Sequence, residues 1–284
     1  MKVVVHKMKK KKIIKKVILF IIAIIIATFF ALPFVYMVLM SFMPDSNSIF
    51  KWPPQLIPDK FPFINYKEAY EYINMTKLIL NTLIMVVSTM ALGITSSLFV
   101  AYGFARFKAK GSNVLFTILL STMMIPWVVT MIPAYVEFEF LGWIGTRLPL
   151  IIPWIGGSAF NVFMLRQFIM MIPKELDEAA KIDGCSSLGI LFKILLPQLR
   201  PVLATLLIFF FINTWSDYVG PSIYLTDPDL HTLSLGMQRY FSALGTANWA
   251  YVMAGSVIFS LPMVLVLFFA QKAFVRGIVT TGLK

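Results

Sequence analysis

The stretch Pro173–Pro197, PKELDEAAKIDGCSSLGILFKILLP, is a polar, helix-forming island in a chain that is otherwise mostly apolar. Pro173 suits the first position of a helix, where its missing N–H group is not needed. Three acidic residues follow in the first turns, where they interact favourably with the helix dipole: Glu175, Asp177 and Glu178. The first half of the stretch therefore predicts a short helix.

The second half of this stretch predicts a turn and another helix. Gly184 can adopt the left-handed conformation that ends many helices. Ser186 or Ser187 can cap the next helix with a hydroxyl group. Pro197 marks the end of that helix, because proline cannot continue a helix without losing a hydrogen bond. Cys185, at the turn, is interpreted as a small structural residue.

The composition indicates a protein that crosses a membrane several times. Hydrophobic residues make up 59% of the 284 residues and aromatic residues 15%, and the mean hydropathy is +0.82. These values exclude an ordinary soluble globular domain. The single cysteine excludes an internal disulfide bond, and the sequence has no cysteine and histidine cluster for a metal.

Six stretches are long and apolar enough to cross a bilayer, which takes about 20 mostly apolar residues. They are Val17–Val38, Leu78–Ala101, Val114–Tyr135, Leu148–Phe168, Pro201–Trp215 with a small extension at each end, and Tyr251–Ala270. The apolar run from Val17 is longer than the ~7–15 residues of a signal-peptide core, so we interpret it as a retained span. The sequence thus predicts an all-α protein with a basic tail at 1–16 and one six-span domain at 17–284. A surface helix is expected at Tyr66–Tyr72.

The basic residues predict how the spans are oriented. With the N-terminus inside, the cytoplasmic segments hold 19 of the 25 Lys and Arg residues, including eight Lys before Val17. The other six lie outside with nine of the 13 acidic residues. This asymmetry agrees with the positive-inside rule and puts both termini in the cytoplasm. It also accounts for the net charge of +12 without a nucleic acid partner.

Motifs of catalysis are missing from the sequence. It has no GxxxxGK[ST] phosphate loop, GxGxxG, HExxH or GxSxG motif. His6 lies in the basic tail and His231 in an external loop, so neither has the surroundings of a catalytic base. We therefore expect no enzyme activity and no bound metal or cofactor. The energy for any transport is expected to come from a partner protein or from an ion gradient. A gradient-driven carrier would be expected to place ionisable residues in the middle of its spans, and none of these spans has one there.

The polar stretch resembles the EAA signature of ABC importer permeases: Glu-Ala-Ala, three residues, Gly, nine residues, Ile, one residue, Leu-Pro. The matching residues are Glu178, Ala179, Ala180, Gly184, Ile194, Leu196 and Pro197, with Asp183 before the glycine. Further landmarks resemble the permeases of carbohydrate ABC importers of the maltose-transporter type: Asn81-Thr82, Ala101–Arg106, Phe163–Phe168, Asn213–Asp217, Leu261-Pro262 and the last residues to Lys284. Trp215-Ser216 departs from the Trp-Asn that is usual in that family, and the end at Thr280–Lys284 departs from its usual tail.

This resemblance implies the type I ABC importer permease fold, with six transmembrane helices and a cytoplasmic coupling helix at 173–197. It implies that two permease subunits, similar but non-identical as is usual in the family, form the pathway in the cell membrane. Two ATP-binding subunits would dock on the coupling helix, and an extracytoplasmic solute-binding protein would deliver the substrate. Glu178 would anchor the docking, Ala179 and Ala180 would allow close approach, and Gly184 would allow the turn.

The transported solute is expected to be a mono- or oligosaccharide. The alternative within the same class is a permease for another solute, such as a polyamine or phosphonate. Asn213, Trp215 and Asp217 at the outer end of the fifth span offer the aromatic face and polar groups that suit a sugar. Tryptophan at a membrane boundary is, however, usually an interfacial anchor, which is the alternative for Trp215. Prolines within the spans, Pro126 among them, are expected to kink the helices.

Overall fold

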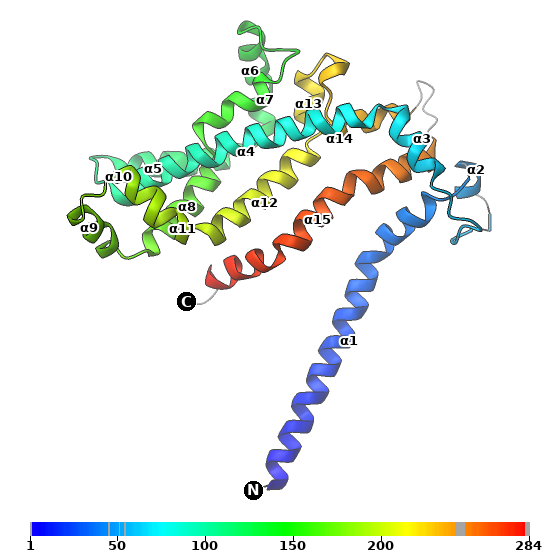
Figure 1. The fold of residues 1–284 in the computed structure, drawn as a ribbon, viewed down its shortest axis with the longest axis horizontal. Coiled ribbons are helices and arrows are strands. Elements are labelled where there is room, and N and C mark those ends of the chain that lie inside the picture. Colours follow the sequence, from blue (N-terminus) through cyan, green and yellow to red (C-terminus); the bar gives the residue numbers. More distant parts are fainter. Residues whose placement is uncertain (1, 45, 51, 54, 242–247, 282–284) are drawn as a thin grey trace. The chain divides into compact units, whose positions relative to one another are not determined.

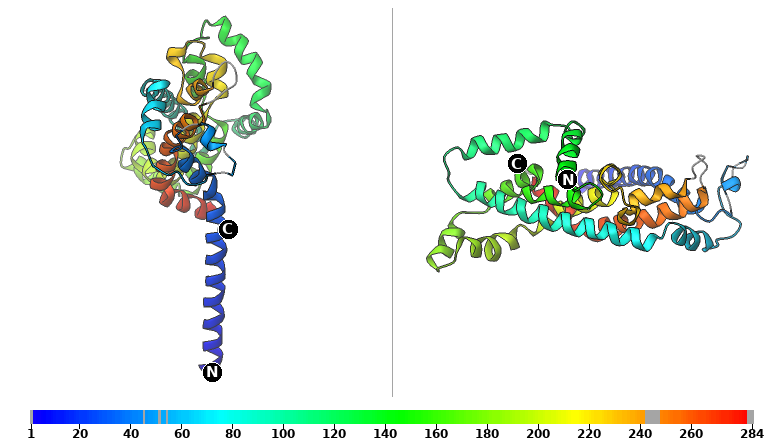
Figure 2. Two further views of the ribbon diagram at one scale, coloured as in Figure 1. Left: turned by 90° about the vertical axis from the view of Figure 1, so that its right-hand side faces the viewer. Right: turned by 90° about the horizontal axis from the view of Figure 1, so that it is seen from above.

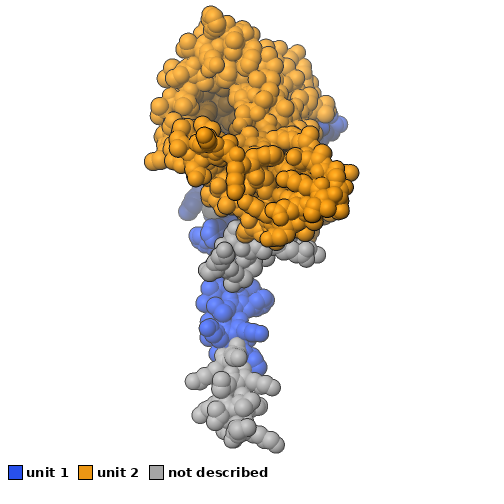
Figure 3. Space-filling model, turned by 90° about the vertical axis from the view of Figure 1, so that its left-hand side faces the viewer, with its two compact units in different colours: residues 1–73, 239–258 blue, residues 74–238, 259–284 orange. Residues whose placement is uncertain are grey.

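The computed structural model describes residues 2–44, 46–50, 52–53, 55–241 and 248–281, and its regular elements in these ranges are all helices. The chain divides into two compact units, Met1–Ile73 with Arg239–Ile258 and Asn74–Gln238 with Phe259–Lys284. Figure 1 labels the helices and Figure 3 colours the two units. Each unit is described by itself.

The first unit contains a long apolar helix and a small polar anchor. Its helices are α1 (Lys2–Met40), α2 (Ser46–Ile49), α3 (Ile64–Tyr72) and the beginning of α15 (Trp249–Thr281). The apolar side chains of α1 from Ile13 to Val38 are mostly exposed, as expected for a helix surrounded by lipid. Asn65 of α3 donates hydrogen bonds to the carbonyl oxygens of Ser41 and Met43. The surface helix predicted at Tyr66–Tyr72 is present as α3, which begins two residues earlier, at Ile64.

The second unit is built around α4 (Met75–Arg106), an unbroken helix of 32 residues. The other elements follow as α5 (Ser112–Ser121), η1 (Thr122–Met124), α6 (Trp127–Phe140), α7 (Leu148–Ile151), η2 (Ile152–Gly156), α8 (Ala159–Met171), α9 (Glu175–Ile182), α10 (Ser187–Gly189), η3 (Ile190–Leu195), α11 (Leu196–Gln198), α12 (Arg200–Ser216), α13 (Val219–Tyr224), η4 (Pro228–Leu230), α14 (Leu233–Gly236) and η5 (Met237–Tyr240), which crosses the unit boundary. α4 packs against both α8 and α12, as Figures 1 and 2 show.

A tight contact between α4 and α12 lies at Gly93. A Cβ atom added to this glycine would lie 2.5 Å from Cζ of Phe210 in α12 and 3.3 Å from Cε3 of Trp154. No side chain fits in this space, so glycine lets the two helices meet at the middle of α4. The ring of Phe210 also packs edge-on against Trp154, with the centroids 4.5 Å apart.

The described residues contain four helical stretches long and apolar enough to span a membrane: Ile13–Met40, Met75–Arg106, Leu148–Met171 and Trp249–Ala270. Of these, Leu148–Met171 consists of α7, η2 and α8 in succession. Two further pairs are bent, Ser112–Met124 with Trp127–Phe140 by 98° and Ser187–Gln198 with Arg200–Ser216 by 80°. Six spans result if each bent pair counts as one. The predicted all-helical fold with its candidate spans is confirmed.

The predicted third span, Val114–Tyr135, is not one continuous helix. The break falls at Ile125 and Pro126, whose ψ angles of 115° and 134° are extended. A proline disfavours the helical conformation of the residue before it and cannot donate a backbone hydrogen bond. Pro126 therefore interrupts the helix, whereas Pro133 lies within α6.

Candidate functional site

The polar stretch forms the predicted helix, turn and helix. α9 begins at Glu175, two residues after Pro173, and ends at Ile182. Gly184 has a φ angle of +78°, which is the left-handed conformation expected from the sequence. The amide of Gly184 donates to the carbonyl of Lys181, and the amide of Cys185 donates to that of Ala180 at 2.8 Å. These two bonds make a Schellman motif, which satisfies carbonyl groups at the end of the helix.

The helix after the turn is capped as predicted but ends differently. The Ser186 hydroxyl accepts a hydrogen bond of 3.1 Å from the amide of Gly189. The helix then passes through the π-helical turn η3 and ends at Gln198, one residue beyond Pro197. In a regular helix the ring of Pro197 would clash with the carbonyl of Lys193. The wider π-helical turn is consistent with relief of this clash.

α9 has one buried face and one exposed face. Asp177 and Ala180 are buried, and they lie on the same side because residues three apart in a helix are neighbours. The opposite side exposes Glu178, Ala179 and Ile182, whose side chain is 88% accessible. Ala180 thus lies on the buried face, and its role in ATPase coupling stays a prediction. Its small side chain lets α9 pack closely on the chain's own core.

A buried ion pair attaches α9 to the end of α4. The Nε atom of Arg106 lies 2.6 Å from Oδ2 of Asp177, and the two side chains are only 6% and 10% exposed. The Nη2 atom of Arg106 also donates to the carbonyl of Ile172, at the end of α8, at 2.9 Å. One turn earlier in α4, the Tyr102 hydroxyl donates to the carbonyl of Ser187 at 3.0 Å. α4 thus holds both helices of the polar stretch.

The signature residues lie together in this segment but divide by exposure. Glu178, Ala179, Asp183, Gly184 and Pro197 are exposed. Ile194 and Leu196 are partly buried against a core that includes Leu191, Leu195 and Ile169. The sequence does not reveal the ion pair, because Asp177 also suits the helix dipole and Arg106 also suits the positive-inside pattern. The sequence feature that could have indicated this ion pair is an acidic residue in the loop together with an arginine at the end of a span.

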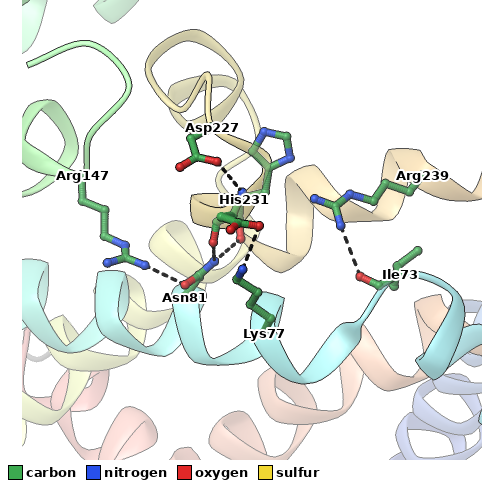
Figure 4. A network of polar contacts seen from close by, with 8 residues as sticks. Ile73, Lys77, Asn81, Arg147, Asp227, His231 and Arg239 are labelled. Atoms are coloured by element: carbon green, nitrogen blue, oxygen red, sulfur yellow. Dashed lines mark hydrogen bonds and ion pairs between the residues drawn. The ribbon is translucent and has the colours of Figure 1, made fainter.

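A second polar network lies at the other end of α4 (Figure 4). The Asn81 amide nitrogen donates to the carbonyls of Asp229 and His231 at 2.8 and 2.9 Å, and its oxygen accepts from Arg147 at 2.7 Å. Lys77 forms an ion pair of 2.8 Å with the Asp229 carboxylate. These contacts tie the segment around η4 to the first turns of α4, so α4 is anchored at both of its ends.

The three candidate pathway residues differ in accessibility. Asn213 is exposed, and its amide donates to the carbonyl of Phe209 in its own helix. Trp215 is 2% exposed, and its indole nitrogen donates to the carbonyl of Phe259 at 3.0 Å. Its ring thus packs inside the second unit, and a contact with the solute stays a prediction.

Asp217 follows the end of α12 and is partly buried. Burial raises the pKa of its carboxyl group above the ordinary value of 3.8, while backbone hydrogen bonds from Gly220 and Val219 oppose this shift. The bond from the Gly220 amide to Oδ1 is 3.1 Å long. The carboxyl group therefore organises the turn into α13.

Comparison with known proteins agrees with this architecture. Residues 93–280 match the model of the family described as "Binding-protein-dependent transport system inner membrane component". The galactooligosaccharides transport system permease protein GanQ of Bacillus subtilis (strain 168) is 30% identical over 281 residues, covering 98% of each chain. The probable starch degradation products transport system permease protein AmyC of Thermoanaerobacterium thermosulfurigenes is 36% identical over 80% of this chain and 83% of its own.

The fold is also similar to a solved structure. A chain of a bacterial ABC transporter involved in the import of the acidic polysaccharide alginate matches with a TM-score of 0.75 and 24% identity, covering 90% of this chain and 96% of the other. Sequence match, helical fold and candidate spans lead to one assignment. The chain belongs to the family of inner membrane components of binding-protein-dependent transport systems.

Proposed function

We propose that this chain is the permease subunit of an ABC importer that moves a mono- or oligosaccharide into the cytoplasm. The family assignment supports a multi-pass membrane subunit rather than a catalytic one. Relatives that match nearly the whole chain are named for the transport of galactooligosaccharides and arabinooligosaccharides, which supports a carbohydrate substrate. ATP hydrolysis is assigned to separate subunits.

The observation that best supports the coupling role is the exposed face of α9. Glu178, Ala179 and Ile182 leave the face opposite the buried ion pair open to a partner. The carboxylate of Glu178 can accept a charge-assisted hydrogen bond from a basic side chain of an ATP-binding subunit, and the apolar side chain of Ile182 can be buried beside it. The proposed assembly contains a second permease, two ATP-binding subunits and a solute-binding protein.

The coupling role is tested by Glu178→Ala in the chain purified with the permease, ATPase and binding protein encoded by neighbouring genes. A hydrogen bond to a charged group contributes about 1.5–3 kcal/mol, so the ATPase should bind at least roughly tenfold more weakly. Lys181→Ala is the control, because Lys181 lies four residues after Asp177 and so on the side of the buried face. Normal ATPase retention and transport by Glu178→Ala would count against α9 as the docking helix.

The substrate class is tested by stimulation of ATP hydrolysis in the reconstituted complex. Binding protein loaded with oligosaccharide should stimulate hydrolysis and uptake, whereas a polyamine or phosphonate should not. Uptake driven by an ion gradient without any ATPase would refute the whole assignment.

The proposed orientation places both termini in the cytoplasm and the segment before α3 outside. In a chain with Cys185→Ser, a membrane-impermeant thiol reagent should label Lys60→Cys in intact cells. Lys10→Cys should react only after permeabilisation. Labelling of position 10 from outside would reverse the topology.

A further inference from the structure

We propose that Arg106 and Asp177 act as a positioning pair that fixes the orientation of α9 on the inner end of α4. This inference rests on the proposed function, because it takes α9 as the helix on which the ATP-binding subunit docks. The pair has no contact with the exposed docking face. Its role is to make α9 and α4 move together when that face is displaced.

Packing alone holds α9 weakly. The helix has eight residues, and isolated helices shorter than about 12–15 residues are marginal in water. Of its apolar side chains, only Ala180 belongs to the core cluster, and its contribution is one methyl group. Leu176 and Ile182 are exposed. The charged contact of Asp177 is therefore the main tertiary interaction that can set the orientation of this helix.

The guanidinium group of Arg106 makes two contacts at once, and together they constrain the orientation of α9. Nε of Arg106 forms the ion-pair contact of 2.6 Å with Oδ2 of Asp177, while Nη2 donates a hydrogen bond of 2.9 Å to the carbonyl of Ile172. One planar guanidinium group thus fixes α9 with respect to both α4 and the end of α8. A lysine ammonium is a flexible point charge and does not reproduce this fixed fork of donors. Arg106→Lys should consequently fail even though it keeps the charge.

Burial makes the pair sensitive to loss of either partner. A buried charge whose partner is removed is strongly destabilising, whereas removal of both charges is often tolerated. Asp177→Asn leaves the guanidinium group without its counter-charge in a site that is 6% exposed. Its effect should therefore fall on the attachment of α9 rather than on the membrane spans.

The first test measures amide hydrogen exchange of the full-length chain in lipid nanodiscs. In Asp177→Asn and Arg106→Lys, the amides of α9 should exchange at least about tenfold faster, while those of α8 and α12 should be unchanged. Glu175→Gln is the matched control, because Glu175 is an exposed acid of the same helix. The double variant Arg106→Gln with Asp177→Asn should cost no more than either single change, since coupled residues are not additive.

The second test measures transport in the complex with its ATPase and binding protein. Asp177→Asn should retain the ATPase on the exposed face but transport several-fold less solute per ATP hydrolysed. Unchanged α9 exchange together with unchanged transport per ATP in Asp177→Asn would overturn the proposal, as would additive effects of the two charge removals. Failure of the wild-type chain to bind any ATPase would instead refute the proposed function, and the exchange measurement would still decide the positioning role.

Discussion

The turn at Gly184 allows a quantitative test of what sets the orientation of α9. Its φ angle is +78°, and a Cβ atom added there would have no heavy atom within 4 Å. A new methyl group therefore meets open space, and the cost of Gly184→Ala comes from the backbone alone. An L-residue in the left-handed conformation costs roughly 1–2 kcal/mol. Such a cost lowers the ratio of molecules with the turn formed to molecules with the turn disrupted by a factor of about 5–30.

The assay is amide exchange over α9 and α10 in the purified chain, with membrane abundance measured in parallel. The amide exchange rate of α9 and α10 should rise from the wild type through Gly184→Asn and Gly184→Ala to Gly184→Val. Asparagine tolerates the left-handed region, whereas a β-branched residue does not. Solute uptake should fall in the same order while the protein still inserts normally. The change strains the turn and leaves the spans intact.

Gly103→Ala is the matched control for this series. Gly103 also has no heavy atom within 4 Å of an added Cβ, but it lies inside α4 with an ordinary helical φ. Alanine there should stabilise by up to about 1 kcal/mol. The reasoning is refuted if Gly184→Ala exchanges like the wild type, or if the two alanine variants lose the same stability.

Other predictions follow from single contacts. Gly189→Ala should lower the melting temperature because its Cβ would lie 2.6 Å from Sγ of Cys185, and adding Cys185→Ala should restore it. Asn81→Leu should cost about 1–3 kcal/mol for each buried group left unsatisfied, whereas Asn213→Leu should cost little because that side chain is exposed. Asp217→Asn should raise the melting temperature at neutral pH and lose this advantage below pH 3.8. The raised pKa means that the folded protein holds the proton more tightly, so stability falls as pH rises through the window above 3.8.

The local features of the coupling segment could be predicted from the sequence. The left-handed turn at Gly184 and the cap at Ser186 depend on a few neighbouring residues, so the residue types were sufficient. The break at Pro126 was expected only as a kink. Hydropathy records how apolar a segment is and not the direction in which it continues, so two helices at 98° resembled a single span.

Contacts between distant segments could not be predicted in this way. Asp177 fitted the first turn of a helix, and nothing local distinguishes that role from a pairing with Arg106. Trp215 fitted both a sugar site and a membrane interface, yet a carbonyl of α15 accepts its indole hydrogen bond. In both cases the deciding partner comes from another helix. The pattern within one segment does not specify which helix packs beside it.

The placement of Gly93 gives α4 the properties of a lever. Gly93 lies twelve residues from Asn81 and thirteen from Arg106, so its contact with Phe210 of α12 falls at the midpoint between the two anchors. At 1.5 Å per residue, the anchors are about 38 Å apart along a helix without a break. A rod that tilts about its middle moves its ends in opposite directions. If α4 tilts about its contact with Phe210, displacement of the end that holds α9 swings the η4 segment the other way, as a transporter needs if one side is to open while the other closes.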